Sequence, residues 1–260
     1  MQATELIRLV NEAFEKRGTG NYSQALEAFE TLEKLSEHSK DISTLRLYQT
    51  YCLLDMGRVG DALDRIRSVR GEDLEEPLRA VYEYHFARAL HALGQVQDAI
   101  AHIENARRMF DSLSEELVDR DIVANAETRL GLMLAESKRC DEALPLLQKV
   151  TIHDYDWGYA KLRMGDCYFE AKQYHEAIEC YSTIVSSDLK IDPAVRTDAL
   201  RNIGCCHYWL GEYAKSVNYL TKIKDAYEAY PDLKDRVLSF LASASAQLKA
   251  SDDQAKKGDW

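Results

Sequence analysis

The segment Gly20-Asn21-Tyr22-Ser23-Gln24-Ala25-Leu26 has a residue pattern that recurs later in the chain. The closest copies are Lys172-Gln173-Tyr174-His175-Glu176-Ala177-Ile178 and Gly211-Glu212-Tyr213-Ala214-Lys215-Ser216-Val217. Each copy begins with glycine or lysine, has a tyrosine two residues later, and ends with a small residue followed by an aliphatic one. Recurrence of one pattern along a chain indicates a repeat protein.

The pattern occurs six times when the small residue before the aliphatic one, here called the anchor, is used for alignment. The anchors are Ala25, Ala62, Ala99, Ala143, Ala177 and Ser216. Twelve residues before each anchor stands a mostly small residue, and four residues after it a large apolar one. Five residues before it stands glycine, which two copies replace by Lys138 and Lys172. This shared spacing predicts six copies of one structural unit.

Each unit is predicted to be an antiparallel pair of helices. Before the glycine, apolar residues recur at steps of three and four, as in Phe86, Leu90 and Leu93, which marks one face of an α-helix. The glycine then ends the helix, because it adopts the left-handed conformation at little cost. Small residues on both helices allow the two axes to approach closely where they cross.

This pattern resembles the tetratricopeptide repeat (TPR), a helix-turn-helix unit with small residues and an alanine anchor at these positions. The resemblance covers roughly residues 4–230 and implies an all-α fold, a right-handed α-solenoid superhelix of stacked antiparallel helix pairs. We expect about thirteen helices, the last of them a capping helix over residues 233–249. Residues 1–249 are expected to form a single TPR-like solenoid domain, and residues 250–260 a polar, flexible tail.

Two helix starts are marked by capping residues. Ser112, with Glu115 three residues later, forms a capping box that predicts a helix beginning near Glu115. Asp192, followed by Pro193 at the first helical position, predicts a second start.

Composition excludes several functional classes. The formal charge is −11 and the pI is near 5.2, which opposes the phosphate contacts that drive nucleic-acid binding, so we expect no nucleic-acid partner. No apolar stretch approaches the length of a membrane span, so we expect no membrane insertion. The six cysteines lack CxxC spacing, and we expect them to be reduced in a cytoplasmic protein.

Catalytic motifs are absent from the sequence. It contains no GxSxG, P-loop, GxGxxG or HExxH pattern, and we predict that the protein is not an enzyme and needs no cofactor. The nearest approach to a metal cluster is Cys205-Cys206-His207. Adjacent residues of a helix diverge by about 100°, so these three side chains are not expected to share one ion.

The resemblance implies a concave wall lined by the first helix of each pair, where family members hold peptides. Positions at the matching offsets are predicted to form the partner-binding site: Tyr48, Tyr51, Tyr84, Arg88, Asn125, Arg129, Tyr159, Arg163, Asp166, Arg201, Asn202 and Tyr208. The arginines outnumber the acids here, although the whole protein is acidic, which favours a partner with an acidic segment. An alternative is that these arginines pair with neighbouring carboxylates and are aligned only by repetition.

We therefore predict a non-catalytic scaffold or adaptor that binds a peptide or helix of a partner protein in its concave groove. Tyrosine and arginine are the side chains most enriched at binding hot spots, which suits this wall. Two alternatives stay open. One is a regulator that senses an acidic ligand or peptide by a change in superhelix shape, and the other is a structural protein that assembles with itself as a homo-oligomer.

Overall fold

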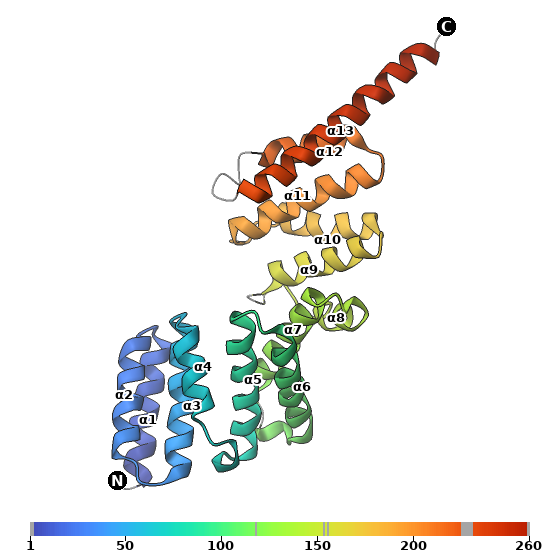
Figure 1. The fold of residues 1–260 in the computed structure, drawn as a ribbon. Helices are drawn as coiled ribbons and strands as arrows, with labels where there is room; N and C mark the ends of the chain where they lie inside the picture. Colours follow the sequence, from blue (N-terminus) through green and yellow to red (C-terminus); the bar gives the residue numbers. More distant parts are fainter. Residues whose placement is uncertain (1–2, 118, 153, 155, 225–230, 259–260) are drawn as a thin grey trace. The chain divides into compact units, whose positions relative to one another are not determined.

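The protein is almost entirely helical in the computed structural model, which describes residues 3–117, 119–152, 154, 156–224 and 231–258. This described part contains thirteen α-helices, two short 3-10 segments and no β-strand, which confirms the predicted all-α class (Figure 1). None of its helices is long and apolar enough to cross a membrane.

The helices fall into two compact units, Met1–Met133 (unit 1) and Leu134–Trp260 (unit 2). Unit 1 contains α1 (Ala3–Gly18), α2 (Tyr22–Leu35), α3 (Ser39–Asp55), α4 (Val59–Arg67), α5 (Glu76–Ala92), α6 (Val96–Ser112) and most of α7 (Arg120–Glu136). Unit 2 contains the end of α7, then α8 (Cys140–Leu147), α9 (Trp157–Glu170), α10 (Tyr174–Ser186), α11 (Pro193–Trp209), α12 (Tyr213–Ile223) and α13 (Pro231–Gly258).

Within each unit the helices form stacked pairs. The two helices of a repeat contact each other in α1–α2, α3–α4, α5–α6, α9–α10 and α11–α12. The second helix of one pair then contacts the first helix of the next, as α2 does with α3 and α10 does with α11. First helices also touch one another, because α9 contacts α11 and α11 contacts α13. The first helices of unit 2 therefore form a continuous wall (Figure 1).

The turn inside each pair has the left-handed residue that the sequence predicts. Gly20, Gly57, Gly94 and Gly211 have φ values between 71° and 80°. Lys138 and Lys172, which replace glycine in two repeats, have φ values of 61° and 60°. A residue with a side chain is strained in this conformation by roughly 1–2 kcal/mol, so the geometry of the turn is imposed by the repeat even where the sequence opposes it.

The anchors lie at the closest contact between the two helices of a pair. All six, Ser216 included, are 0% exposed. The small residue twelve positions earlier faces the large residue four positions after the anchor. A Cβ atom added to Gly165 would lie 2.4 Å from the ring of Tyr181, and one added to Gly204 would lie 2.8 Å from Leu220. The sequence spacing thus records a steric fit between the two helices.

Gly165→Ala should destabilise the protein by roughly 1–3 kcal/mol, because the new methyl group overlaps the buried ring of Tyr181, which would have to shift away from the helix. Gly60→Ala is the matched control, since a Cβ at this helical position meets nothing within 4 Å. It should leave stability unchanged or raise it by up to about 1 kcal/mol. Urea unfolding of both variants checks the prediction, and equal midpoints would contradict the steric fit.

The predicted helix start near Glu115 is wrong. Residues Glu115–Leu117 form a 3-10 turn, and α7 begins at Arg120. Asp119 explains the later start, because its Oδ1 accepts a hydrogen bond from the backbone amide of Asp121 at 2.9 Å, as an N-cap does. The other predicted start is confirmed, since Asp192 accepts from the amide of Ala194 at the beginning of α11.

The last helix, α13, spans Pro231–Gly258 and so includes the residues predicted as a capping helix, 233–249. Residues 251–257 contain no glycine or proline, and their alanine and lysines are good helix formers. The single solenoid domain over residues 1–249 and the flexible tail over residues 250–260 stay predictions.

Candidate functional site

A cavity of about 420 Å³ lies in unit 2 and is here called the unit 2 cavity. Its wall comes mainly from the first helices α9, α11 and α13, with the turn between α7 and α8 at one side. Its lining residues are Ala135, Glu136, Lys138, Cys140, Arg163, Asp166, Cys167, Phe169, Glu170, Tyr181, Arg201, Asn202, Cys205, Leu220, Arg236, Val237 and Phe240. Four of the twelve predicted site residues are among them: Arg163, Asp166, Arg201 and Asn202.

Asp166 is the centre of a hydrogen-bond network in this cavity. It accepts from Arg163 Nη1 at 3.1 Å, from the Tyr181 hydroxyl at 2.8 Å and from Asn202 Nδ2 at 3.0 Å. The donors come from α9, α10 and α11, so one carboxylate joins three helices. Burial and the nearby Asp166 carboxylate both raise the pKa of Tyr181, which therefore donates as a neutral phenol. Asp166 positions its neighbours.

Two arginines of the cavity, Arg163 and Arg201, are paired with carboxylates of the chain itself. Arg163 lies 3.1 Å from Glu136 as well as 3.1 Å from Asp166, and Arg201 lies 3.1 Å from Asp198. Burial alone would lower the pKa of Arg163, but the two carboxylates outweigh it and raise that pKa. The fold itself therefore places negative charge beside both guanidinium groups.

Asp166→Ala should lower the free energy of unfolding by roughly 2–4 kcal/mol, because it leaves the buried Tyr181 hydroxyl without its acceptor and removes one of the two carboxylates that contact Arg163. Glu170→Ala is the control on the same helix. Its ion pair with Lys138 is largely exposed, with side-chain exposures of 57% and 74%, so its loss should change stability by less than about 1 kcal/mol. Urea unfolding that shows equal losses for both variants would contradict a central role for Asp166.

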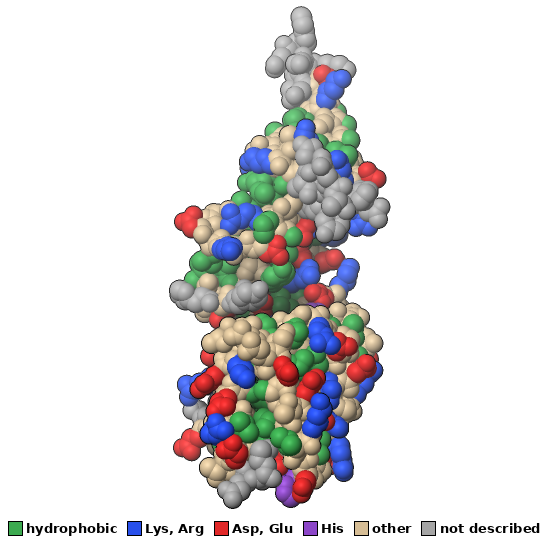
Figure 2. Space-filling model, turned by 90° about the vertical axis from the view of Figure 1, so that its left-hand side faces the viewer, with side chains coloured by type: hydrophobic (Ala, Val, Ile, Leu, Met, Phe, Trp, Pro, Cys, Tyr) green, Lys and Arg blue, Asp and Glu red, His purple; other side chains and the backbone are tan. Residues whose placement is uncertain are grey.

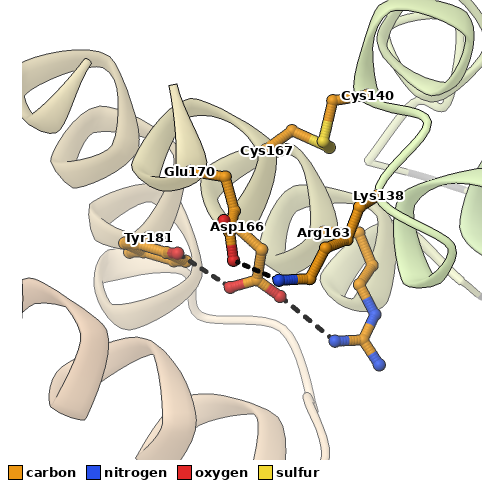
Figure 3. The surroundings of a disulfide bond; sticks show 7 residues. All are labelled: Lys138, Cys140, Arg163, Asp166, Cys167, Glu170 and Tyr181. Carbon is orange, nitrogen blue, oxygen red and sulfur yellow. Dashed lines mark hydrogen bonds and ion pairs between the residues drawn. A yellow bond between two sulfur atoms is a disulfide. The ribbon is translucent and has the colours of Figure 1, made fainter. Parts of the chain in front are cut away.

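A disulfide joins Cys140 to Cys167 at the edge of the same cavity (Figure 3). The Cα atoms are 5.4 Å apart, within the usual range for this bond. The prediction that all six cysteines are reduced is wrong for these two. The repeat register brings them together: Cys140 is three residues before its anchor, and Cys167 is ten before the next. Cross-linking across 27 residues restricts the unfolded chain, which is worth about 3–4 kcal/mol.

The other four cysteines are free thiols, and burial suppresses their reactivity. Cys205 lines the cavity, yet burial raises its pKa to about 11, so it is protonated near neutral pH. Burial also raises the pKa of the neighbouring thiol of Cys206, to about 12. Among the residues that the structure describes, no group of three or more His, Cys, Asp or Glu side chains is placed to hold a metal ion.

A second cluster of predicted site residues lies in unit 1. Tyr51 stacks on His85 with ring centroids 4.0 Å apart, and the Arg88 guanidinium lies 5.9 Å from the centroid of the Tyr84 ring. Arg88 Nη1 is 3.2 Å from Nδ1 of His85. Tyr51, Tyr84 and His85 are each at most 7% exposed, so little of their surface can meet a ligand. These aromatic residues serve the packing of unit 1.

Asp55 is the carboxylate of this cluster. Arg17 Nη2 lies 2.7 Å from it and Arg88 Nη2 lies 3.8 Å from it. His85 is held neutral, because burial first, and then the charges of Arg88, Arg17 and Arg129, lower its pKa well below the ordinary value. A neutral ring leaves Nδ1 able to accept from Arg88.

Stability should therefore fall as the solution becomes more acidic. Below about pH 6.5 the unfolded chain binds a proton at His85 that the folded protein does not, so the free energy of unfolding drops by about 1.4 kcal/mol per pH unit. Above that pH both states are neutral and the effect vanishes. Urea unfolding between pH 7 and pH 5 should show a steeper loss for wild type than for His85→Gln. Equal slopes would mean that His85 binds its proton in the folded state.

The remaining predicted site residues are spread over both units. Tyr48 is partly buried against Phe14, 4.7 Å between ring centroids, and Asn125 is exposed on α7. Arg129 lies on α7 in unit 1, whereas Arg163 belongs to unit 2. Tyr159 donates to Asp192 at 3.0 Å, and Tyr208 packs edge-on against Phe240. The predicted set is thus divided, and the unit 2 cavity holds one part of it.

Several residues that line the cavity lie outside the set predicted from the first helix of each repeat. Tyr181 and Leu220 belong to second helices, yet both line the cavity. Each stands four residues after its anchor, opposite Gly165 or Gly204, and a glycine there is the signal that the side chain passes between the helices. Arg236, Val237 and Phe240 come from α13, which the sequence marks only as a cap.

Comparison with known proteins places the chain in a family. The family model described as Tetratricopeptide repeat protein 21 ARM repeat matches residues 8–184. The chain belongs to this tetratricopeptide repeat family. A second tetratricopeptide repeat model matches residues 198–229 and so covers the sixth repeat. None of the curated proteins compared with the chain matches it.

Three solved structures illustrate how this fold occurs in other proteins. One is a Rap protein complexed with competence and sporulation factor, with TM-score 0.66 and 13% identity over 98% of this chain and 75% of that one. Another is the apo form of the quorum sensor NprR from B. thuringiensis, with TM-score 0.65 and 16% identity over 91% and 68%. YrrB, a TPR protein with an unusual peptide-binding site, has TM-score 0.56 and 17% identity over 87% and 99%. These likenesses establish the TPR fold.

Proposed function

We propose that the protein is a non-catalytic scaffold that binds a segment of a partner protein, and that the unit 2 cavity is a binding site for that segment. The observation that carries this proposal is the combination of a fixed polar network with apolar surface in one cavity. A volume of about 420 Å³ suits one or two side chains of a partner. The peptide-binding site of YrrB and the complex of the Rap protein with competence and sporulation factor, both in proteins that share the fold, support this proposal.

The apolar lining of the cavity includes two phenylalanine rings and a valine. Phe169 belongs to α9, while Val237 and Phe240 lie one turn apart on α13. Val237 is 1% exposed, so it forms the floor, and the two rings are partly exposed. Binding hot spots combine an apolar anchor in a pocket with polar groups at its edge. An apolar or aromatic residue of the partner is the group that this surface would hold.

Charge favours an acidic residue beside that apolar group. The lining has four cations, Lys138, Arg163, Arg201 and Arg236, against the three acids Glu136, Asp166 and Glu170. On the face drawn in Figure 2, acidic and basic side chains are interspersed. A local excess of positive charge would therefore attract a partner's carboxylate only over a short distance. Arg163 and Arg201 have carboxylates of their own, which leaves exposed Arg236 as the cation best placed to contact a partner.

The test uses a library of random twelve-residue peptides displayed on phage, selected against the full-length protein. The affinity of a selected, fluorescently labelled peptide is then measured by anisotropy at two salt concentrations. Arg236→Gln should weaken binding about tenfold or more, through loss of a charge-assisted contact, and binding should weaken as salt rises. Lys234→Gln, on the same helix outside the cavity lining, is the matched control and should bind like wild type.

Two results would contradict the proposal. Failure of the selection to yield any binding peptide would argue against a peptide site in this chain. Equal effects of Arg236→Gln and Lys234→Gln would place the peptide somewhere other than the unit 2 cavity.

A further inference from the structure

We infer that the Cys140–Cys167 disulfide is a redox site whose reduction releases one wall of the unit 2 cavity, so that binding there depends on the thiol state of the protein. The expected effect of reduction on peptide binding rests on the function proposed above. The expected effect of reduction on the structure of the cavity wall is independent of that function.

The disulfide connects the parts of the wall that could separate. Cys140 is the first residue of α8 and is partly exposed, whereas Cys167 lies within α9 and is 2% exposed. Both line the cavity. Figure 3 shows the bond directly beside the side chains of Lys138, Glu170, Arg163 and Asp166, with the turn before α8 on one side and α9 on the other.

The ion pairs of Lys138 with Glu170 and of Glu136 with Arg163, which join this turn and the end of α7 to α9, are at least partly exposed to solvent. Lys138 occupies the left-handed position that glycine takes in four other repeats, so the turn is strained. Its ion pair with Glu170, 3.3 Å long, is largely exposed and contributes at most about 1 kcal/mol. The α8 helix has eight residues and contains Pro145, which removes one backbone hydrogen bond. Buried Ala143, Leu146 and Leu147 fix only its later part.

Movement of the turn would change the ion pairs of residues that line the cavity. Glu136, the last residue of α7, is four residues from Cys140 and pairs with Arg163 at 3.1 Å. When the turn moves, Arg163 loses this partner and Glu170 loses Lys138. The oxidised cavity has these side chains already in place, and ordering them again on binding would cost affinity. We therefore expect the oxidised form to bind more tightly.

The chemistry is ordinary thiol–disulfide exchange with a dithiol reductant. A thiolate of the reductant attacks the sulfur of Cys140, the more exposed partner, and the Cys140–Cys167 bond breaks with Cys167 leaving as a thiolate that takes up a proton. The second thiol of the reductant then attacks the mixed disulfide and releases Cys140. The protein gains two electrons and two protons, and the reductant becomes a disulfide.

Cys205 does not replace the external reductant, although it lines the same cavity. Burial raises its pKa to about 11, so almost none of it is thiolate at neutral pH. The disulfide is therefore stable in the absence of a reductant.

The structural test is hydrogen–deuterium exchange of the full-length protein with and without dithiothreitol. The amides of Lys138, Arg139, Glu142 and Ala143 are bonded within the turn, to the carbonyls of Ala135, Leu134 and Arg139. Reduction should make them exchange about tenfold faster, because the turn opens locally. The turn at Lys172 is an internal control, since it has the same left-handed lysine and equivalent bonds from Lys172, Gln173 and Ala177. Its exchange should not change.

The binding test uses the peptide selected on the oxidised protein. Its affinity should fall about tenfold on reduction, and Cys140→Ser should bind weakly with or without reductant. Cys52→Ala is the matched control. Cys52 occupies the same repeat position as Cys167 but is a free thiol, so this variant should keep the redox response.

The outcomes separate this inference from the proposed function. Equal exchange of the Lys138 turn in both redox states overturns the inference, whether or not a peptide binds. A peptide that binds equally to both states also overturns it while leaving the proposed function intact. If no peptide binds in either state, the proposed function fails, and the exchange measurement alone decides whether the disulfide controls the wall.

Discussion

The close crossing of the two helices in each repeat is the constraint on which the rest of the structure depends. Gly165 and Gly204 leave no room for a Cβ atom, because Tyr181 and Leu220 lie directly against their backbones. These two side chains belong to second helices, and both line the unit 2 cavity. The feature that packs the repeat thus also builds the cavity, and the Tyr181 hydroxyl then fixes Asp166.

The repeat register also explains the disulfide. The residue three positions before one anchor meets the residue ten positions before the next, and in the fourth and fifth repeats both are cysteine. The same positions in the first and second repeats are Tyr22 and Cys52, which cannot form a disulfide. The disulfide lies near Lys138, where the turn has a left-handed lysine in place of glycine. One of the two turns with such a lysine is therefore also cross-linked.

Much of the fold can be predicted from the sequence, because helix pairing depends on local spacing that six repeats display. The left-handed turns, the buried anchors and the start of α11 at Pro193 follow from it. The contacts of the site residues are harder to predict from the sequence, because their partners come from other helices. The sequence brings Arg163, Asp166, Arg201 and Asn202 to one wall, but the pairing of Arg163 with Glu136 depends on how α7 ends beside α9. The burial of Tyr51 and Tyr84 likewise depends on stacking between repeats.

The functional interpretation rests on partner binding in the unit 2 cavity. NMR of a bound, selected peptide tests this, with nuclear Overhauser effects recorded to the rings of Phe169 and Phe240, which line the cavity and are partly exposed. Contacts from an apolar residue of the peptide to these two rings are expected. Contacts confined to residues outside the cavity lining, such as Leu238, which is 40% exposed on α13, would contradict it.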